Sequence, residues 1–302
     1  MADPIARLES EGKVQRDVRL SRYTTYKMGG PAAFLVEAAD ENDVVAAALL
    51  ATRESLPVLP LGRGSNVVVS AAGFTGVVVR STGKLTEIRM VDDGLVVAGG
   101  GCPLPVLARE TVAAGRGGLE FFTGIPGSVG GAVRMNAGCH GSETVDHLVD
   151  VRIVDLVDGM AEVRAANSLD LAYRHSNLTD RDFVVSARFH TDAVDPAVGR
   201  AQIREITRWR RLNQPGGTLN AGSVFKNPPG DSAGRLIDSL GLKGWQMGGA
   251  AVSDRHANFI VARDDATPTD IHRLVRAVQR RVEAEAGVRL EPEIRFVGEF
   301  DD

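Results

Sequence analysis

The sequence predicts a mixed fold of the α+β or α/β class, and three observations lead to that prediction. Short runs of β-branched and aliphatic residues alternate with amphipathic helical segments along the chain. Its 302 residues are enough for two or three compact domains, without an internal repeat or a low-complexity segment. A hydrophobic content of 43% and a charged content of 25% are typical of a soluble globular protein.

The expected strands are short apolar segments bounded by turn residues. A polar lead-in precedes the first of them, and Gly29-Gly30-Pro31 supplies strong turn punctuation at its start. The expected strands comprise residues 33–37, 57–61, 67–70, 76–80, 85–91, 95–99, 149–157, 161–165, 183–190, 258–263 and 294–297.

The expected helices show apolar residues at helical spacing. Thr267, Pro268 and Asp270 form a capping signal before the last helix, and Gly287 is expected to end it. Gly241 is expected to end an earlier helix in the left-handed conformation. The expected helices comprise residues 40–53, 103–115, 196–211, 232–240 and 268–286. The apolar stripe of the third one consists of Ile203, Ile206 and Trp209.

One stretch, GGLEFFTGIPGSVGGAVRMNAGCHG at residues 117–141, differs from the rest of the chain. It holds eight glycines, with a ninth at position 115. Each glycine would destabilise a helix by roughly 1 kcal/mol relative to alanine, so we expect neither an ordinary helix nor a strand there. Side chains such as Phe121, Phe122 and Val133 argue against a solvated linker, which leaves a buried, ordered loop.

Glycine also leaves backbone N–H groups free to turn toward one anion or one flat ring. Suitable polar side chains in the same stretch belong to Thr123, Ser128 and Asn136. We therefore predict that this loop holds a phosphate-bearing cofactor.

A second glycine turn, Gly62-Arg63-Gly64-Ser65-Asn66, follows an expected strand. A dinucleotide-binding fingerprint would add a third glycine and open a helix, but the next residues read VVVS and favour a strand. The sequence therefore argues against a Rossmann fold. A strand–turn–strand loop whose N–H groups bind a phosphate remains open.

Charge and composition exclude several classes of protein. The net charge of −4 without a dominant basic tract argues against a nucleic-acid binder. No apolar run is long enough for a membrane helix, and the start of the chain lacks a signal-peptide pattern. Cys102 and Cys139 are too few for a disulfide framework or a zinc site, so we expect no metal. We expect a cytoplasmic protein and a monomer.

Four stretches together resemble one known family. They are TTYKMGGPA (24–32), LGRGSN (61–66), GIPGSVGGAVRMNAG (124–138) and AGSVFKNP (221–228), with LEPEIRFVG (290–298) near the end. The chain resembles UDP-N-acetylenolpyruvoylglucosamine reductases, FAD-dependent enzymes that make UDP-N-acetylmuramate for bacterial peptidoglycan. The resemblance covers nearly the whole chain. Its third and fourth motifs are specific, whereas GxGSN alone would not be.

The resemblance implies an α+β protein with an FAD-binding fold of the vanillyl-alcohol oxidase type, made of two subdomains, and a C-terminal substrate-binding domain. The expected subdomains are residues 1–80, to which residues 289–302 return, and residues 81–190. The substrate domain is expected at residues 191–288. Tyrosines occur only at 23, 26 and 173, so the chain resembles the shorter form of the family, which lacks an inserted tyrosine-bearing loop.

The resemblance also implies non-covalent FAD and NADPH as a co-substrate. The two glycine loops would hold the FAD pyrophosphate and the flavin. The implied cofactor-binding residues are Gly62, Arg63, Gly64, Ser65, Asn66, Thr123, Gly124, Ile125, Pro126, Gly127, Ser128, Gly130, Gly131, Asn136 and Gly138.

The implied reaction passes a hydride from NADPH through FAD to the enolpyruvyl carbon distal to the carboxylate, and then protonates the carbon beside it. Ser223 matches the family's proton donor, although alone it would be assigned to a turn. Arg174 matches an arginine whose fork of donors suits a developing carboxylate dianion. Glu293 matches the catalytic glutamate, and Glu291, two residues earlier, is the competing assignment. Glu293 and Arg295 should point away from Ile294 and Phe296.

Substrate contacts are implied for Lys226, Asn227, Tyr173 and Arg211. The chain departs from the family at 213–215, where NQP replaces a triplet that begins with lysine. Two alternatives follow: Arg210 or Arg211 takes over that charge, or binding of the diphosphate is weaker. It also reads MNAGCHG where MNAGAYG is usual. We expect structural roles for Cys139 and His140.

Two other functions stay open at this point. The chain could be another flavoenzyme of the same fold, such as an oxidase of an alcohol or sugar. It could also be a catalytically inactive FAD- or nucleotide-binding protein, against which the joint presence of the three catalytic matches argues.

Overall fold

The computed structural model describes residues 3–91 and 94–300. The chain forms two compact units. Unit 1 comprises Met1–Val18, Ala32–Arg63 and Thr75–Trp209, and unit 2 comprises Arg19–Pro31, Gly64–Phe74 and Arg210–Asp302. The outer ends of the expected segments 1–80 and 289–302, at residues 1–2 and 301–302, lie outside the described residues. The three-domain boundaries expected near residues 80 and 190 stay predictions.

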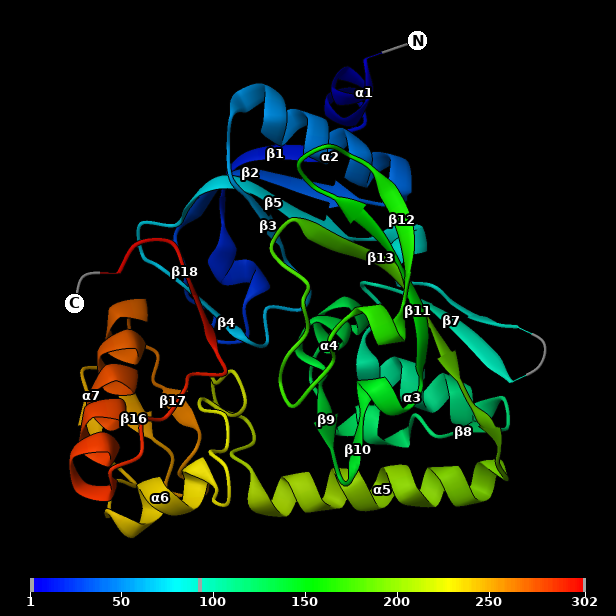
Figure 1. The fold of residues 1–302 in the computed structure, drawn as a ribbon. Coiled ribbons are helices and arrows are strands. Elements are labelled where there is room, and N and C mark those ends of the chain that lie inside the picture. The colour runs from blue at the N-terminus through cyan, green and yellow to red at the C-terminus, as the bar shows by residue number, and fades with distance from the viewer. Residues whose placement is uncertain (1–2, 92–93, 301–302) are drawn as a thin grey trace. The chain divides into compact units, whose positions relative to one another are not determined.

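Unit 1 begins with a sheet of strand order β1-β2-β5-β3, in which β3 and β5 are parallel. Helices α1 and α2 lie on the same side of this sheet in Figure 1, and Leu8, Val36 and Leu50 are fully buried in the shared core. Helix α2 begins as expected, because Asp40 Oδ1 accepts a hydrogen bond of 3.1 Å from Asp43 N. The elements are α1 (Pro4–Ser10), β1 (Val14–Arg19), β2 (Pro31–Ala38), α2 (Glu41–Glu54), β3 (Val58–Pro60) and β5 (Phe74–Ser81).

The second sheet of unit 1 is antiparallel throughout, with strand order β12-β11-β13-β7-β6. Its core includes Leu107, Phe122 and Phe189, all fully buried. The larger elements are β6 (Ile88–Met90), β7 (Leu95–Gly99), α3 (Leu104–Ala113), α4 (Val129–Met135), β11 (Leu148–Asp155), β12 (Ala161–Ala165), β13 (Asp182–His190) and α5 (Pro196–Asn213). Short paired strands are β8 (Arg116–Gly117), β9 (Gly138–Cys139), β10 (Ser142–Glu143) and β14 (Asp192–Ala193).

Unit 2 joins the C-terminal part of the chain to two short segments from near its N-terminus. Strands β4 and β18 pair in parallel, and β15, β16 and β17 form an antiparallel sheet. Tyr26 and Val68 enter the same core as Leu274, and the Tyr26 hydroxyl donates to Ile260 O at 2.9 Å. The elements are β4 (Val67–Val69), α6 (Ala233–Ser239), β15 (Gln246–Met247), β16 (Ala250–Val252), β17 (Ile260–Ala262), α7 (Pro268–Ala286) and β18 (Arg295–Val297).

All five expected helices are present, with ends shifted by a few residues. The capping box of α7 is confirmed, because Asp270 N donates to Thr267 Oγ1 at 3.2 Å and Thr267 N donates to Asp270 Oδ2 at 2.9 Å. Gly241 and Gly287 adopt φ of 66° and 69°, as expected for helix ends. Among the described residues, no helix has both the length and the apolar character that a membrane span requires.

The sequence analysis assigned no helix or strand to the polar lead-in, but the structure forms α1 and β1 there. Asp3 caps the seven-residue helix α1 by accepting a hydrogen bond of 3.0 Å from Ile5 N, and Leu8 is fully buried. Strand β1 then adds an edge to the first sheet. The apolar residues of α1 are too few to show helical periodicity in the sequence, so only packing reveals the helix.

The prediction that the glycine-rich stretch 117–141 contains no helix is wrong. Helix α4 covers seven residues of it, including Gly130 and Gly131. Gly130 N donates to Gly100 O at 2.7 Å, so tertiary contacts offset the poor helix propensity of glycine. The expected strand at 85–91 is shorter than expected, because a 3-10 helix at Gly83–Thr86 precedes β6.

Candidate active site

Tertiary hydrogen bonds and burial order the glycine-rich stretch. Val129 N donates to Cys102 O at 3.0 Å, beside the bond between Gly130 and Gly100. The expected buried character of the stretch is confirmed for Phe122 and Val133, which are fully buried, and Ser128 is 2% exposed. The loop that follows β7 therefore anchors the stretch, a role that the sequence analysis did not assign to it.

Asn136 ends α4 in the left-handed conformation, with φ of 39°. Its Nδ2 donates to Glu143 Oε2 at 2.9 Å and to Ala172 O at 3.1 Å. Its Oδ1 accepts from Val145 N at 2.9 Å. Both amide protons and one acceptor position are used inside the protein, so this side chain orders the turn after α4.

The turn 62–66 approaches other parts of the chain too closely for side chains at its glycines. A Cβ atom on Gly62 would overlap Ser128 Oγ, and one on Gly64, which has φ of 62°, would overlap Tyr23 O. Within residues 3–91 and 94–300, no N–H group of the turn 62–66 donates a hydrogen bond to a protein acceptor. A run of such N–H groups is a typical anion-binding feature.

Arg174 belongs to unit 1 and adopts a left-handed conformation, with φ of 54°. Its Nη2 donates to Gly138 O at 2.8 Å, and its Nη1 lies 3.9 Å from Glu143 Oε1. Its guanidinium carbon lies 5.0 Å from the centre of the Tyr173 ring. The Arg174 side chain is 18% exposed, and these contacts hold its guanidinium group at the turn after α4.

Ser223 and Glu293 lie on neighbouring backbone segments of unit 2. Glu293 N donates to the carbonyl oxygen of Val224, the residue after Ser223, at 2.7 Å. Asn66 Nδ2 donates to Glu293 O at 3.0 Å, and Arg295 N donates to Asn66 O at 2.9 Å. The structure therefore brings two of the three expected catalytic residues together with the end of the glycine turn.

The sequence analysis missed the residue that fixes the Ser223 segment. Asn258 is buried, its Oδ1 accepts from Phe225 N at 2.9 Å, and its Nδ2 donates to Phe225 O at 2.8 Å. Its carbonyl oxygen accepts from Val224 N at 2.9 Å. A lone amide at the start of the apolar run FIVA was the available signal.

Lys226 forms an ion pair with the rejected candidate Glu291, with 2.6 Å between Nζ and Oε1. Asn227 Oδ1 accepts from Ala233 N at 3.1 Å, where α6 begins. Arg211 is exposed near the end of α5. The substrate-binding roles of these residues and of Tyr173 stay predictions.

Cys139 and His140 follow the glycine-rich motif. Cys139 Sγ lies 3.1 Å from Phe121 O. The His140 ring meets the Trp209 ring edge to face, with 5.0 Å between their centres. Trp209 is 44% exposed, so it extends the buried stripe of α5 only in part.

Two family profiles match this chain. One, described as the FAD binding domain, matches residues 32–163, and the other, described as UDP-N-acetylenolpyruvoylglucosamine reductase, C-terminal domain, matches residues 214–297. A UDP-N-acetylenolpyruvoylglucosamine reductase from Symbiobacterium thermophilum is 42% identical over 292 residues, which are 96% of this chain and 94% of that protein. This chain belongs to the UDP-N-acetylenolpyruvoylglucosamine reductase family.

Other members of the UDP-N-acetylenolpyruvoylglucosamine reductase family agree with this assignment. The one from Erythrobacter litoralis is 40% identical over 299 residues, covering 99% of this chain and 92% of its own length. The crystal structure of the one from Thermus caldophilus matches with a TM-score of 0.81 and 37% identity, over 94% of this chain and 99% of that chain. The predicted α+β fold, an FAD-binding part followed by a C-terminal domain, is confirmed.

The residues present fit FAD, the cofactor of the matching profile. The turn 62–66 offers N–H groups without protein acceptors, and the same holds among the described residues for the N–H groups of Ser128 and Gly131. Gly62 faces the Ser128 hydroxyl directly, so no side chain fits at position 62. The N–H groups of Gly62, Arg63, Ser128 and Gly131 all belong to unit 1, and such donors suit a pyrophosphate. The individual cofactor contacts expected from the sequence stay predictions.

Proposed function

We propose that this chain reduces UDP-N-acetylglucosamine enolpyruvate to UDP-N-acetylmuramate, with non-covalent FAD as cofactor and NADPH as reductant. The observation that carries this proposal is the hydrogen bond from Glu293 N to Val224 O, which sets the Ser223 segment beside the Glu293 segment in a member of the reductase family. Unit 1 would provide most of the FAD-binding part, and unit 2 would provide the substrate-binding part.

Bound FAD would supply the hydride chemistry, taking a hydride from NADPH for the enolpyruvyl carbon distal to the carboxylate. The N–H groups of the turn 62–66 and of Ser128 and Gly131 would bind its pyrophosphate. Asn136 would act indirectly, because its amide is bonded to the turn that carries Gly138 and Glu143.

Ser223 would donate its hydroxyl proton to the carbon beside the carboxylate. The hydride and this proton together saturate the enolpyruvyl double bond, and the serine oxygen then recovers a proton from water. A serine hydroxyl is a weak acid, so it must be held close to the carbon that it protonates. Asn258 supplies that position by holding the backbone on both sides of Val224.

Arg174 and Glu293 would stabilise the negative charge that develops on the substrate carboxylate. A guanidinium fork can donate two parallel hydrogen bonds to a carboxylate, and these strengthen as negative charge accumulates. The bonds from Arg174 to Gly138 and its approach to Glu143 restrict the guanidinium before substrate binds. Glu293 would act as an acid toward the same intermediate.

Lys226, Asn227, Tyr173 and Arg211 would contact the UDP-sugar. The Lys226 ammonium already pairs with Glu291, so binding a diphosphate there requires the cation to be shared with that carboxylate or released from it. We also propose that the enzyme acts as a cytoplasmic monomer, which size-exclusion chromatography with light scattering checks.

An anaerobic absorption experiment tests the proposal. We expect the visible flavin band of the purified protein to bleach with NADPH and to return only when UDP-N-acetylglucosamine enolpyruvate is added. Return with oxygen or with an alcohol substrate, but not with this sugar, would identify an oxidase of the same fold. A flavin band that NADPH does not bleach would indicate a binding protein without reductase activity.

The variant Ser223→Ala separates the two half-reactions. Bleaching by NADPH should persist, whereas reoxidation by the enolpyruvyl sugar should slow by about 10²- to 10⁴-fold, the usual contribution of one acid–base group. Ser239→Ala, in the same unit, is the matched control and should behave as wild type. Equal reoxidation rates in the two variants would remove Ser223 from the mechanism.

A further inference from the structure

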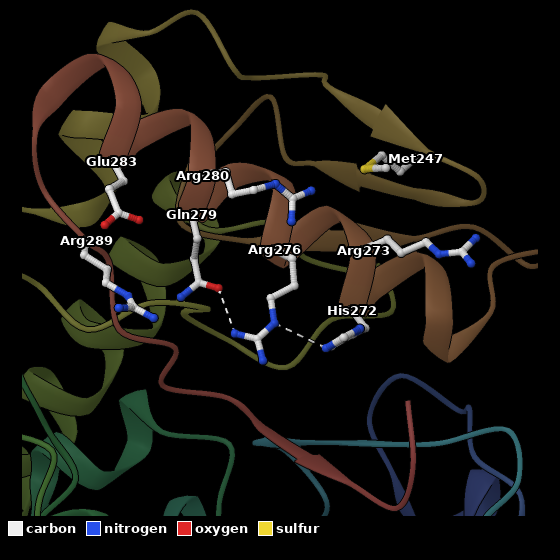
Figure 2. Close-up of a pocket in the computed structure, with 8 residues that line it drawn as sticks. All are labelled: Met247, His272, Arg273, Arg276, Gln279, Arg280, Glu283 and Arg289. Carbon is white, nitrogen blue, oxygen red and sulfur yellow. Dashed lines mark hydrogen bonds between the residues drawn. The ribbon is translucent and has the colours of Figure 1, made fainter. Parts of the chain in front are cut away.

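A cavity of about 630 Å³ runs along α7 in unit 2, and none of its lining residues has a role in the reaction proposed above. Figure 2 shows Arg273, Arg276 and Arg280 projecting from the same stretch of α7, with Arg289 reaching in from the segment after the helix. Met247 lines the cavity from β15. The volume is within the range of small-molecule sites.

The charge of this cavity is opposite to that of the chain. Among the described lining residues, four arginines face one acid, Glu283, on a protein whose net charge is −4. On the same helix but outside the cavity, Arg281 pairs with Glu285 at 2.6 Å. An arginine on a solvated helix face is ordinarily paired with an acid three or four residues away, as Arg281 is. The lining of the cavity instead has more arginines than acids.

Most of the lining arginines have no carboxylate partner in the described part of the chain. Within the described residues, Arg280 and Arg289 form no ion pair, whereas Arg273 interacts with the charge of Asp270. Arg276 donates to His272 Nε2 at 3.4 Å and to Gln279 Oε1 at 3.2 Å, and neither acceptor is a carboxylate (Figure 2). These bonds orient the Arg276 guanidinium without pairing it with an acid.

Two lining side chains, Gln279 and His272, are buried and form the floor beside Arg276. Gln279 is 9% exposed and donates from Nε2 to Leu290 O at 2.8 Å, and His272 is 4% exposed. The His272 ring meets the Phe296 ring edge to face, with 4.8 Å between centres. These contacts restrict the two side chains that accept hydrogen bonds from Arg276.

The spacing of the arginines fits an extended anion. Positions 273, 276 and 280 share one helix face, and the first and last are separated by about 10 Å along the axis at 1.5 Å per residue. Guanidinium groups bind phosphate in bidentate geometry. We propose that the α7 cavity is a binding site for a ligand with at least two phosphoryl groups, supplied by a soluble diphosphate or by phospholipid headgroups.

Calorimetric titration of the FAD-loaded protein with inorganic pyrophosphate tests the site. The double variant Arg273→Gln/Arg280→Gln keeps Arg276 and its bonds to the floor. We expect it to bind pyrophosphate at least about tenfold more weakly than wild type, because each charge-assisted contact contributes on that scale. Circular dichroism and the melting temperature report whether the variant is folded.

The matched control is Arg263→Gln/Arg281→Gln, which makes the same change in net charge at exposed arginines outside the cavity. It should retain wild-type affinity. Any pyrophosphate bound at the substrate site contributes equally to both variants, so failure of the proposed reaction does not alter this comparison. Equal affinities in the two double variants, or no binding of pyrophosphate or vesicles by wild type, would overturn the proposal.

Vesicle cosedimentation distinguishes the two sources of the ligand. Binding to phosphatidylglycerol vesicles but not to phosphatidylcholine vesicles, with loss in Arg273→Gln/Arg280→Gln only, supports headgroup recognition at this site. Arginine-dependent binding of pyrophosphate without vesicle binding supports a soluble ligand.

Discussion

The carboxylate of Asp43 in unit 1 is fully buried, so it needs charged or hydrogen-bonding partners in the folded protein. It accepts from Arg7 Nη2 at 2.7 Å, from Lys13 Nζ at 2.8 Å and from Ala39 N at 2.9 Å. Burial by itself would raise the pKa of this carboxyl, but the hydrogen bonds from Lys13, Ala39 and Arg7 outweigh it and lower the pKa.

We predict that Asp43→Asn lowers the free energy of unfolding by about 3 kcal/mol at pH 7, near the lower end for a broken buried pair because Arg7 and Lys13 stay partly exposed. Since the folded pKa is depressed, this stabilisation is full above the unfolded pKa of about 3.9 and is lost as pH falls from there through the lower folded pKa. Urea unfolding at several pH values measures the difference.

Glu11→Gln is the control for Asp43, because Glu11 contacts the same two cations from a side chain that is 40% exposed. Its effect on the free energy of unfolding should be small, because water screens an exposed ion pair. The difference between Asp43→Asn and wild type should shrink as pH falls from about 5 toward about 1, and a difference that does not change over this range would contradict the assigned pKa shift.

Gly64 shows how one backbone conformation shapes the turn 62–66. We predict that Gly64→Ala lowers both stability and FAD affinity, because φ of 62° strains alanine by about 1 kcal/mol and its Cβ would also overlap Tyr23 O. Gly12→Ala, with φ of 68° and open space around it, isolates the strain alone. Flavin content and urea midpoints give the comparison, and equal losses would show that the overlap has no consequence.

At the scale of elements, the extended segment around Ser223 is hydrogen-bonded to two other segments, one on each side. Asn258 holds Phe225 from one side, while Glu293 N donates to Val224 O from the other. The position of Ser223 therefore depends on contacts made by residues 35 to 70 positions away in the chain.

We predict that Asn258→Ala destabilises the protein by about 1–3 kcal/mol, because two buried backbone groups of Phe225 lose their partner. Turnover by the proposed reaction should fall while KM for NADPH and flavin content are unchanged. Asn220→Ala, a partly exposed amide in the same unit, is the control. Loss of flavin together with turnover would indicate general disruption instead of a positioning role.

At the scale of the whole molecule, two units share one chain that passes between them several times. Each unit holds one tryptophan, Trp209 in unit 1 and Trp245 in unit 2. The profile of the FAD-binding domain covers residues 32–163, which fall mostly in unit 1. Fluorescence can therefore follow each unit separately.

We predict that removing FAD lowers the melting temperature of unit 1, and that FAD at about 100 times its dissociation constant restores about 2.7 kcal/mol of stability. The variant Trp245→Phe leaves Trp209 as the reporter of unit 1, and Trp209→Phe reports unit 2. An FAD-independent midpoint for the Trp209 signal would contradict the proposal that unit 1 provides most of the FAD-binding part.

The sequence by itself determined the five longer helices, most strands and the family, because periodicity, caps and motifs are encoded in short windows. The capping box at Thr267 and the helix end at Gly287 depend only on neighbouring residues. Motifs likewise identified the candidate residues Ser223, Arg174 and Glu293 before any geometry was known.

Only the tertiary structure decided which distant segments join. Helix α4 forms despite its glycines because Gly130 donates to Gly100, and residues 19–31 and 64–74 enter unit 2 because Tyr26 and Val68 are buried in its core. Asn258 forms no motif. Its role comes from long-range contacts to Phe225, whose energies no local pattern records.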